Sequence, residues 1–228
     1  MFKALKKKVT KYYKYTTLNV TKVGSPTVTS NGIASGFTSS NYLRTPNVVF
    51  QSKWEVCVKF TTGSDVTSGV WVVGGGGSQV RLIMGYNGSK FRLILSSNNS
   101  SANLADINGN HTVKTNTTYW LKMQFTGTQY IMSYSTDGKN FTTDYTLTSS
   151  TKLYEDGKPL SLGVNQYSNG VNGVMTTGSI DLKECYIKQN GMIYWTGMSY
   201  SPSNSSSYDF SRTEDGYFVY KKDNKYYS

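Results

Sequence analysis

The run from Tyr119 to Thr143 constrains the fold of this chain more than any other stretch. Large apolar residues recur at every second position through its segments, which are separated by Gly127-Thr128 and Asp137-Gly138. Both dipeptides are typical of two-residue hairpin loops, so the run predicts a meander of antiparallel strands. A shift of one residue would turn the apolar set toward water, which specifies the register strongly. The predicted facing pairs on the apolar side are Phe125 with Tyr130, Met123 with Met132, Leu121 with Tyr134, and Tyr134 with Phe141.

A second hairpin is predicted from Val80 to Leu95, closed at Asn87-Gly88. The alternation turns one set of apolar residues toward the core and leaves Arg81 and Arg92 on the other face, among isoleucines. Two arginines on one sheet face form a surface that can bind a ligand. The alternative is that they only contact solvent, and the pattern leaves both open. The predicted core pairs are Val80 with Leu95, Leu82 with Leu93, and Met84 with Phe91.

Short strand-like segments recur along the rest of the chain, with turns rich in glycine and asparagine between them. Trp54–Phe60 alternates between apolar and polar residues, whereas Val70–Val73 is apolar throughout. The 19 tyrosines and 22 glycines are also typical of strands and turns. We therefore expect an all-β fold, namely a two-sheet antiparallel jelly-roll sandwich. No repeat of the length found in solenoids or propellers is present.

The two ends of the chain are predicted to lie outside this sandwich. Near the N-terminus, apolar residues follow helical spacing among lysines, which predicts a short basic helix or arm for oligomerisation or docking. The alternatives are a first turn that lies on the domain, or a basic arm without structure. The anchoring residues would be Phe2, Leu5, Val9 and Tyr12. The predicted divisions are a basic N-terminal anchor at 1–15, the sandwich at 16–200, a serine-rich linker at 201–207 and a small C-terminal β appendage at 208–228.

The charge and the cysteines argue against several classes of function. The net charge is +11, but the excess of lysine lies at the two ends without a nucleic-acid-binding motif, so we expect no nucleic-acid partner. No apolar run is long enough to span a membrane. Cys57 and Cys185 could form a bridge in a sandwich, yet free thiols are favoured because no secretion signal is recognisable. The single His111 has no metal-binding neighbour in the sequence, so we expect no metal and no other cofactor.

The acidic residues do not indicate a catalytic pair. Glycosidases of the jelly-roll type need two carboxylates on one strand face. Asp181 and Glu184 are three positions apart and are therefore expected on opposite faces of a regular strand. Glu155-Asp156 is predicted in a turn, and Glu214-Asp215 in the C-terminal appendage. We therefore predict no catalytic residues and no enzymatic activity.

Binding is the remaining class of function, and aromatic rings with fixed polar side chains are the residues that recognise sugars. Tyr86 and Tyr167 are the favoured aromatic candidates because both are predicted in loops. For every aromatic candidate, Trp195 included, a position in the core is an equal alternative. The predicted glycan-binding residues are Trp71, Arg81, Tyr86, Arg92, Asn165, Tyr167 and Asn169.

Three stretches resemble concanavalin A-like (laminin-G-like) modules, namely Trp54–Asp65, Tyr119–Gly138 and Gly178–Glu184. The resemblance extends roughly from Gly36 to Trp195, and it implies a two-sheet jelly roll. Such modules are common in proteins of tailed phages, especially those of gut bacteria, and in bacterial surface proteins. The calcium-binding and acidic catalytic positions of better-known relatives have no clear match here, so the resemblance supports neither calcium nor catalysis.

In the phage setting, the resemblance implies a virion surface component such as a fibre, head fibre or decoration protein. We expect such a protein to be assembled in the host cytoplasm, displayed on the virion, and in contact with host or environmental glycans. Its N-terminal residues would bind other virion proteins or form a homo-oligomer, with a trimer favoured. The alternative is a bacterial surface adhesin or carbohydrate-binding module, located at the cell surface or outside the cell. A lectin-fold glycosidase is less favoured.

Overall fold

The computed structural model describes residues 9–75, 81–98, 103–155, 157–167, 170–203, 210–213, 218–222 and 225–227. In these residues all regular structure is β-sheet, which confirms the predicted all-β class. Within the same ranges there is no helix with the length and apolarity needed to cross a bilayer. The chain divides into a large unit, Asn19–Gly197, and a smaller unit formed by both ends of the chain.

The large unit contains one sheet of seven antiparallel strands. Its centre is buried on both faces, as expected for the continuous apolar run Val70–Val73 in the strand Val70–Gly74. In spatial order the strands are β10 (Ala105–Thr112), β9 (Lys90–Leu95), β8 (Leu82–Asn87), β7 (Val70–Gly74), β14 (Pro159–Leu162), β5 (Tyr42–Asn47) and β2 (Thr21–Val23).

The second sheet of this unit has eight strands and contains the predicted meander. Seven of them follow in the spatial order β13 (Thr142–Thr148), β12 (Gln129–Ser135), β11 (Thr118–Phe125), β6 (Trp54–Thr62), β17 (Gly178–Gln189), β4 (Ile33–Ser35) and β3 (Thr27–Val28). The eighth strand, β18 (Met192–Thr196), pairs with the end of β17. A separate small hairpin consists of β15 (Asn165–Tyr167) and β16 (Gly170–Asn172).

The core of the sandwich lies between these two sheets. On β11 and β6 the buried positions alternate with partly exposed ones, as a strand with one face on the core requires. Rings from opposite sheets meet there: Phe60 of β6 stacks on Tyr86 of β8 at 6.1 Å, and Phe91 of β9 meets Tyr119 of β11 at 5.2 Å. Each such fully buried side chain contributes about 1.5–3 kcal/mol to folding.

The predicted register of the meander is confirmed between β11 and β12, where Phe125 pairs with Tyr130 and Leu121 with Tyr134. The predicted pair of Tyr134 with Phe141 is wrong, because Tyr134 pairs with Thr142 instead. The connection is longer than two residues, because β12 ends at Ser135 and β13 begins at Thr142, and within it Asp137 accepts hydrogen bonds from the amides that follow it. The displacement places Phe141 against Lys122 on the outer face, with 4.1 Å between the ammonium and the ring centroid.

The pairing of β8 with β9 is displaced by two residues from the predicted one. Its turn residues are Gly88 and Ser89, both with positive φ, rather than Asn87 and Gly88. A type I′ turn needs positive φ at both central positions, which this choice satisfies. Leu82 therefore pairs with Leu95 and not with Leu93. A displacement of this size leaves every side chain on its predicted face, because the side-chain period of a strand is two.

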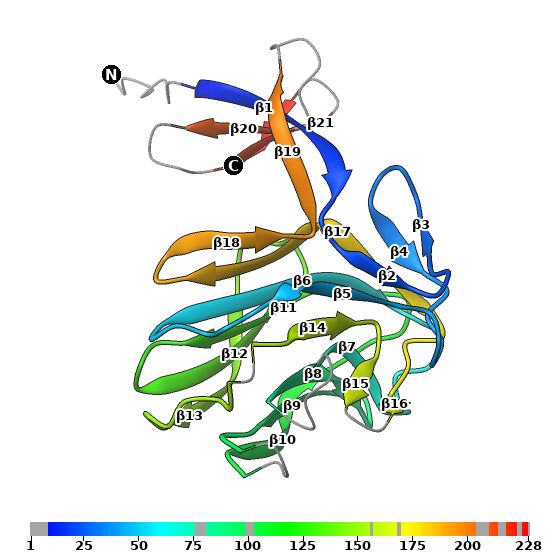
Figure 1. Ribbon diagram of the computed structural model, residues 1–228, viewed down its shortest axis with the longest axis vertical. Coiled ribbons are helices and arrows are strands. Elements are labelled where there is room, and N and C mark those ends of the chain that lie inside the picture. The colour runs from blue at the N-terminus through cyan, green and yellow to red at the C-terminus, as the bar shows by residue number, and fades with distance from the viewer. Residues whose placement is uncertain are drawn as a thin grey trace. The chain divides into compact units, whose positions relative to one another are not determined.

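The smaller unit corrects the prediction of an N-terminal helix. Residues Val9–Leu18 form a strand, β1, which suits their threonines and tyrosines and which pairs with β19 (Met198–Ser203) and β20 (Phe210–Thr213). Two heptads of helical spacing were too short to outweigh this pairing. The sheet continues through β21 (Phe218–Lys222) and β22 (Lys225–Tyr227), and Figure 1 shows strands from both chain ends side by side in it.

The predicted divisions at the chain ends change accordingly. The N-terminal and C-terminal segments, expected as a separate anchor and appendage, share this one five-stranded sheet. Residues 201–203 belong to β19 rather than to a linker. Of the predicted anchoring residues, Val9 and Tyr12 lie on β1, whereas Phe2 and Leu5 lie outside the described residues.

Candidate functional site

Most of the predicted glycan-binding side chains are buried and leave little surface for a ligand to contact. The exposed fraction is 7% for Trp71, 0% for Arg81 and Tyr86, and 4% for Asn165. Trp195, the further aromatic candidate, is also buried, and its indole donates a hydrogen bond to the carbonyl of Asn19 at 2.7 Å. For these residues the expectation of an exposed binding surface is wrong.

The contacts of Arg81 and Asn165 explain their burial. The guanidinium of Arg81 donates hydrogen bonds to the carbonyl oxygens of Val48, at 2.9 Å, and Pro159, at 3.2 Å, and it pairs with Glu155 at 3.6 Å. Asn165 accepts a hydrogen bond from the amide of Gly75 at 3.0 Å. Both side chains therefore fix backbone segments that are distant in the sequence.

The remaining candidates do not form a common site in the described residues. Arg92 is partly exposed, but its guanidinium binds Asp106 through two hydrogen bonds of 3.0 Å and lies 5.3 Å from the centroid of the Trp71 ring. Tyr167 is half-buried on β15. Asn169 lies outside the described residues, so its predicted role stays a prediction.

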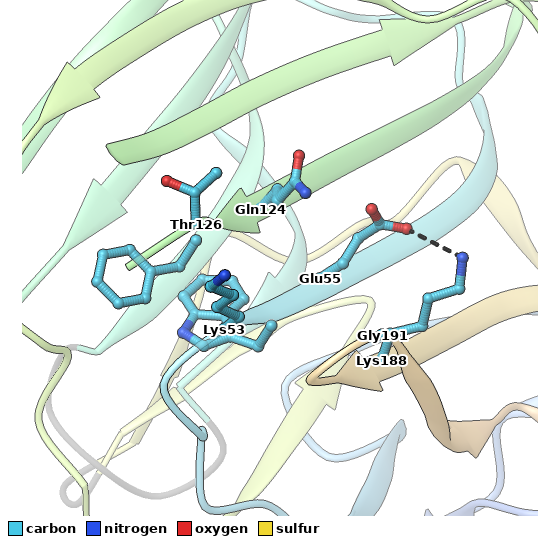
Figure 2. A pocket seen from close by; sticks show the side chains of 8 residues that line it. Lys53, Glu55, Gln124, Thr126, Lys188 and Gly191 are labelled. Atoms are coloured by element: carbon cyan, nitrogen blue, oxygen red, sulfur yellow. Dashed lines mark ion pairs between the residues drawn. The ribbon is translucent and has the colours of Figure 1, made fainter. Parts of the chain in front are cut away.

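The structure contains a pocket that the sequence did not indicate. It has a volume of about 330 Å³ and lies on the eight-stranded sheet. At this place β6 begins, β11 ends, and β17 turns into β18. Figure 2 shows the polar side chains that surround it. The lining residues are Lys53, Trp54, Glu55, Gln124, Phe125, Thr126, Lys188 and Gly191.

One row of outward-facing residues forms the polar side of the pocket. Gln124 of β11 pairs in register with Glu55 of β6, and Glu55 pairs in register with Lys188 of β17. Directly opposite residues on neighbouring strands have their Cβ atoms about 4.5–5.5 Å apart, so these side chains are close neighbours. No pattern along the sequence could indicate this row, because it joins residues from three distant segments.

Glu55 is the acidic centre of the pocket. Its carboxylate forms ion pairs with Lys188 at 3.6 Å and with Lys122 at 3.8 Å, and it accepts a hydrogen bond from the hydroxyl of Tyr186. Burial, with the neighbouring Cys57 and Glu55, raises the pKa of Tyr186 far above its ordinary value. The Tyr186 hydroxyl therefore keeps its proton at neutral pH and remains a donor to Glu55.

Two other polar lining groups, Lys53 and Gln124, leave hydrogen-bonding capacity at the opening. The ammonium of Lys53 has no ion pair within the described part of the chain. The Gln124 amide contributes both a donor and an acceptor. The Thr126 hydroxyl is already engaged, since it accepts from the amides of Gln129, at 3.1 Å, and Thr128, at 3.5 Å, and donates to the carbonyl of Gln129 at 3.4 Å. The pocket thus combines cationic, anionic and neutral polar groups on rigid strands, an arrangement suited to a ligand with many hydroxyls.

A pair of acids lies elsewhere on the outer face of this sheet, contrary to the prediction. The pairing of β17 with β6 shifts between Asp181 and Tyr186, and this irregularity brings Asp181 and Glu184 to the same ammonium. Lys59 lies 3.0 Å from Asp181 and 3.9 Å from Glu184, and 4.7 Å from the ring of Trp120. Burial raises the pKa of Glu184. Neither acid lines the pocket.

No metal cluster accompanies these groups: within the described ranges, no three or more His, Cys, Asp or Glu side chains gather in a geometry that could hold an ion. Both cysteines, Cys57 and Cys185, are buried and free, which confirms the expectation of thiols.

Comparison with known proteins identifies the fold but no family. No family model matches this sequence. No curated protein matches it either. Solved structures match the sandwich, among them one of a botulinum neurotoxin and one of a phage tailspike domain.

In two of these solved structures the likeness extends over most of this chain. One is a chain of botulinum neurotoxin type C, a toxin whose cell entry depends on interaction with two ganglioside molecules, with a TM-score of 0.53, 10% identity, and coverage of 82% of this chain and 49% of that one. The other is the enzymatically active domain of tailspike protein 2 of bacteriophage CBA120, with a TM-score of 0.52, 12% identity, and coverage of 77% of this chain and 29% of that one. The chain covers less than half of either match. At this identity the likeness shows the fold alone.

Proposed function

We propose that the Asn19–Gly197 sandwich is a glycan-binding module of a phage virion protein of the fibre, head-fibre or decoration type. In this proposal the module binds its glycan without cleaving it. It is displayed on the virion surface, and the sheet formed by the two chain ends contacts other virion proteins or further copies of the chain, with a trimer favoured.

The pocket is the observation on which this proposal depends. Its volume of about 330 Å³ lies at the lower end of the range found for small-molecule sites, which is ~300–1,000 Å³. The polar groups around it are held by register pairing of Gln124, Glu55 and Lys188, so they do not need to be ordered when a ligand binds. Fixed donors and acceptors of this kind suit the hydroxyl groups of a sugar.

The likeness to a toxin that interacts with gangliosides and to a phage tailspike domain is consistent with glycan binding on this fold. Three sequence stretches resemble modules that occur both in tailed phages and on bacterial surfaces, and the likeness to the tailspike domain favours the virion setting over the alternative of a bacterial adhesin or carbohydrate-binding module. Mass spectrometry of purified virions separates the two, since the adhesin would be found on cells and not in particles.

The contacts of the acidic side chains support binding without cleavage. Glu55, the carboxylate of the pocket, is held by two lysines and a tyrosine hydroxyl. Asp181 and Glu184 both lie at the ammonium of Lys59 and outside the pocket, so neither acid faces the proposed ligand. Product analysis after incubation with polysaccharides should therefore detect no hydrolysis.

A glycan array on the full chain tests the binding itself. We expect at least one glycan to bind, and Gln124→Ala to weaken that binding by about tenfold, which corresponds to ~1.4 kcal/mol. Gln166→Ala is the matched control, since Gln166 lies on β15 with its side chain bound to Arg44. An array without any bound glycan, or binding that Gln124→Ala leaves unchanged, would contradict the proposal.

A further inference from the structure

We infer that the pocket accepts a negatively charged sugar unit, whose carboxylate or sulfate group binds the ammonium of Lys53. This inference rests on the proposed glycan-binding function and adds the charge of the ligand to it.

The charges at the pocket are unbalanced in favour of an anion. Three ammonium groups, those of Lys53, Lys122 and Lys188, lie at or beside the pocket, whereas the lining contains the one carboxylate of Glu55. Glu55 is paired with Lys122 and Lys188. Lys53 is left without an ion pair in the part of the chain that the structure describes. An anionic ligand group would supply the missing partner.

The backbone at Lys53 is held in place although its side chain is exposed. Its carbonyl oxygen accepts a hydrogen bond of 2.9 Å from the amide of Asn190, and Ser52 and Asn190 meet through their side chains at 3.1 Å. These contacts fix the segment before β6 against the turn between β17 and β18. The ammonium therefore extends from a fixed point at the rim, which lowers the entropy cost of binding.

Neighbouring groups define where the rest of the sugar would lie. Figure 2 shows Lys53 beside Gln124 and Thr126, with the ion pair of Glu55 and Lys188 on the other side. A sugar whose anion lies at Lys53 would meet the Gln124 amide with its neutral hydroxyl groups.

The test compares charged and neutral forms of the same polymer on the full chain. The probes are polygalacturonate, its fully methyl-esterified form, dextran sulfate and dextran, with affinity measured by biolayer interferometry. We expect polygalacturonate or dextran sulfate to bind at least about tenfold more tightly than its neutral counterpart, and to weaken as salt screens the charge. The polymer that binds more tightly identifies the anion as a carboxylate or a sulfate.

A pair of charge-matched variants locates the contact. Lys53→Gln should weaken binding of the charged polymer by about tenfold and leave the neutral form unaffected. Lys22→Gln removes the same charge from an exposed position on β2 of the other sheet and should change neither. Equal weakening by both variants would mean general attraction to a chain of net charge +11, and would overturn the inference.

The failure of this inference is distinct from the failure of the proposed function. Equal binding of charged and neutral polymers, or binding of neutral ones alone, would overturn the charge of the ligand but leave glycan binding in place. If neither this panel nor the glycan array shows any binding, both proposals are wrong.

Discussion

Oδ1 of Asp144 accepts a hydrogen bond from the backbone amide of His111 at 2.7 Å. The same oxygen accepts a second bond from the amide of Asn110 at 2.8 Å. Asp144 lies on β13 at the edge of the eight-stranded sheet, and both amides lie on β10 at the edge of the seven-stranded sheet. One buried carboxylate thus joins the two sheets at this edge of the sandwich. Among the described residues, neither β10 nor β13 has a hydrogen-bonded partner strand on its outer side, and this contact takes the place of such a pairing.

Asp144→Ala should lower the free energy of unfolding by about 2–3 kcal/mol, because two partly buried amides of β10 lose a charged acceptor. Asp144→Asn retains a carbonyl oxygen at the same position and should cost less. Urea unfolding monitored by tryptophan fluorescence measures both. If the alanine variant is as stable as the unmodified chain, this contact does not hold the sheets together.

Gly109 is packed against the same carboxylate. A Cβ atom at this position would lie 1.7 Å from Oδ2 of Asp144, so Gly109→Ala should destabilise the chain by forcing β10 or β13 to move. The cost should fall when Asp144 is already alanine, and a double-mutant cycle measures this coupling. Gly69→Ala is the control, since its Cβ would meet Asn87 at an ordinary 3.6 Å. Equal costs in both backgrounds would contradict the prediction.

Arg81 and Arg92 should differ sharply in their contribution to stability. Arg81→Met leaves the carbonyls of Val48 and Pro159 and the acid Glu155 without their buried cation, and should cost about 3–5 kcal/mol. Arg92→Met removes a partly exposed pair with Asp106 and should cost less than about 1 kcal/mol. Thermal and urea unfolding of the two variants provide the comparison. Similar losses would mean that the burial of Arg81 does not determine its role.

The outcome for these two arginines shows what a sequence pattern can predict. Alternation placed them both on one sheet face, and this is local information that the structure retains. What covers that face at Arg81 is the segment that contains Glu155 and Pro159, together with Val48, and these are distant in the sequence. Burial of a polar residue by such partners has no local signal.

The same distinction explains the other outcomes. The register of β11 and β12 depends on adjacent residues and a short turn, so it was predictable. The strand β1 pairs with residues near the opposite end of the chain, and no spacing within Val9–Leu18 could reveal this. The pocket depends on three strands lying side by side, so its residues could be recognised only in the folded structure.

The two cysteine thiols should be unreactive in the folded chain. Burial raises the pKa of Cys57 to about 12 and also raises that of Cys185, so neither forms appreciable thiolate at pH 8. Ellman's reagent should therefore detect little thiol in native protein and both thiols after denaturation. Rapid labelling of the native chain would show that one cysteine is accessible. Failure to label the denatured, unreduced chain would indicate a disulfide.

The stability of the sandwich should fall as the pH decreases from neutrality, in part because of His111. Its ring stacks on Tyr134 at 3.9 Å between the centroids, and burial lowers its pKa from the ordinary value of 6.5. The unfolded chain therefore binds a proton on this residue at a higher pH than the folded chain does. The contribution is complete above about pH 6.5 and is lost progressively as the pH falls through the folded pKa.

His111→Gln should reduce this dependence. The difference in unfolding free energy between the variant and the unmodified chain is to be measured from pH 7.5 to pH 5. Few carboxylates are protonated in this range, and those that are occur in both chains. This difference should shrink toward acidic pH, because the unmodified chain loses the contribution of neutral His111 and the variant has none to lose. A constant difference across the range would show that His111 has the same pKa in both states.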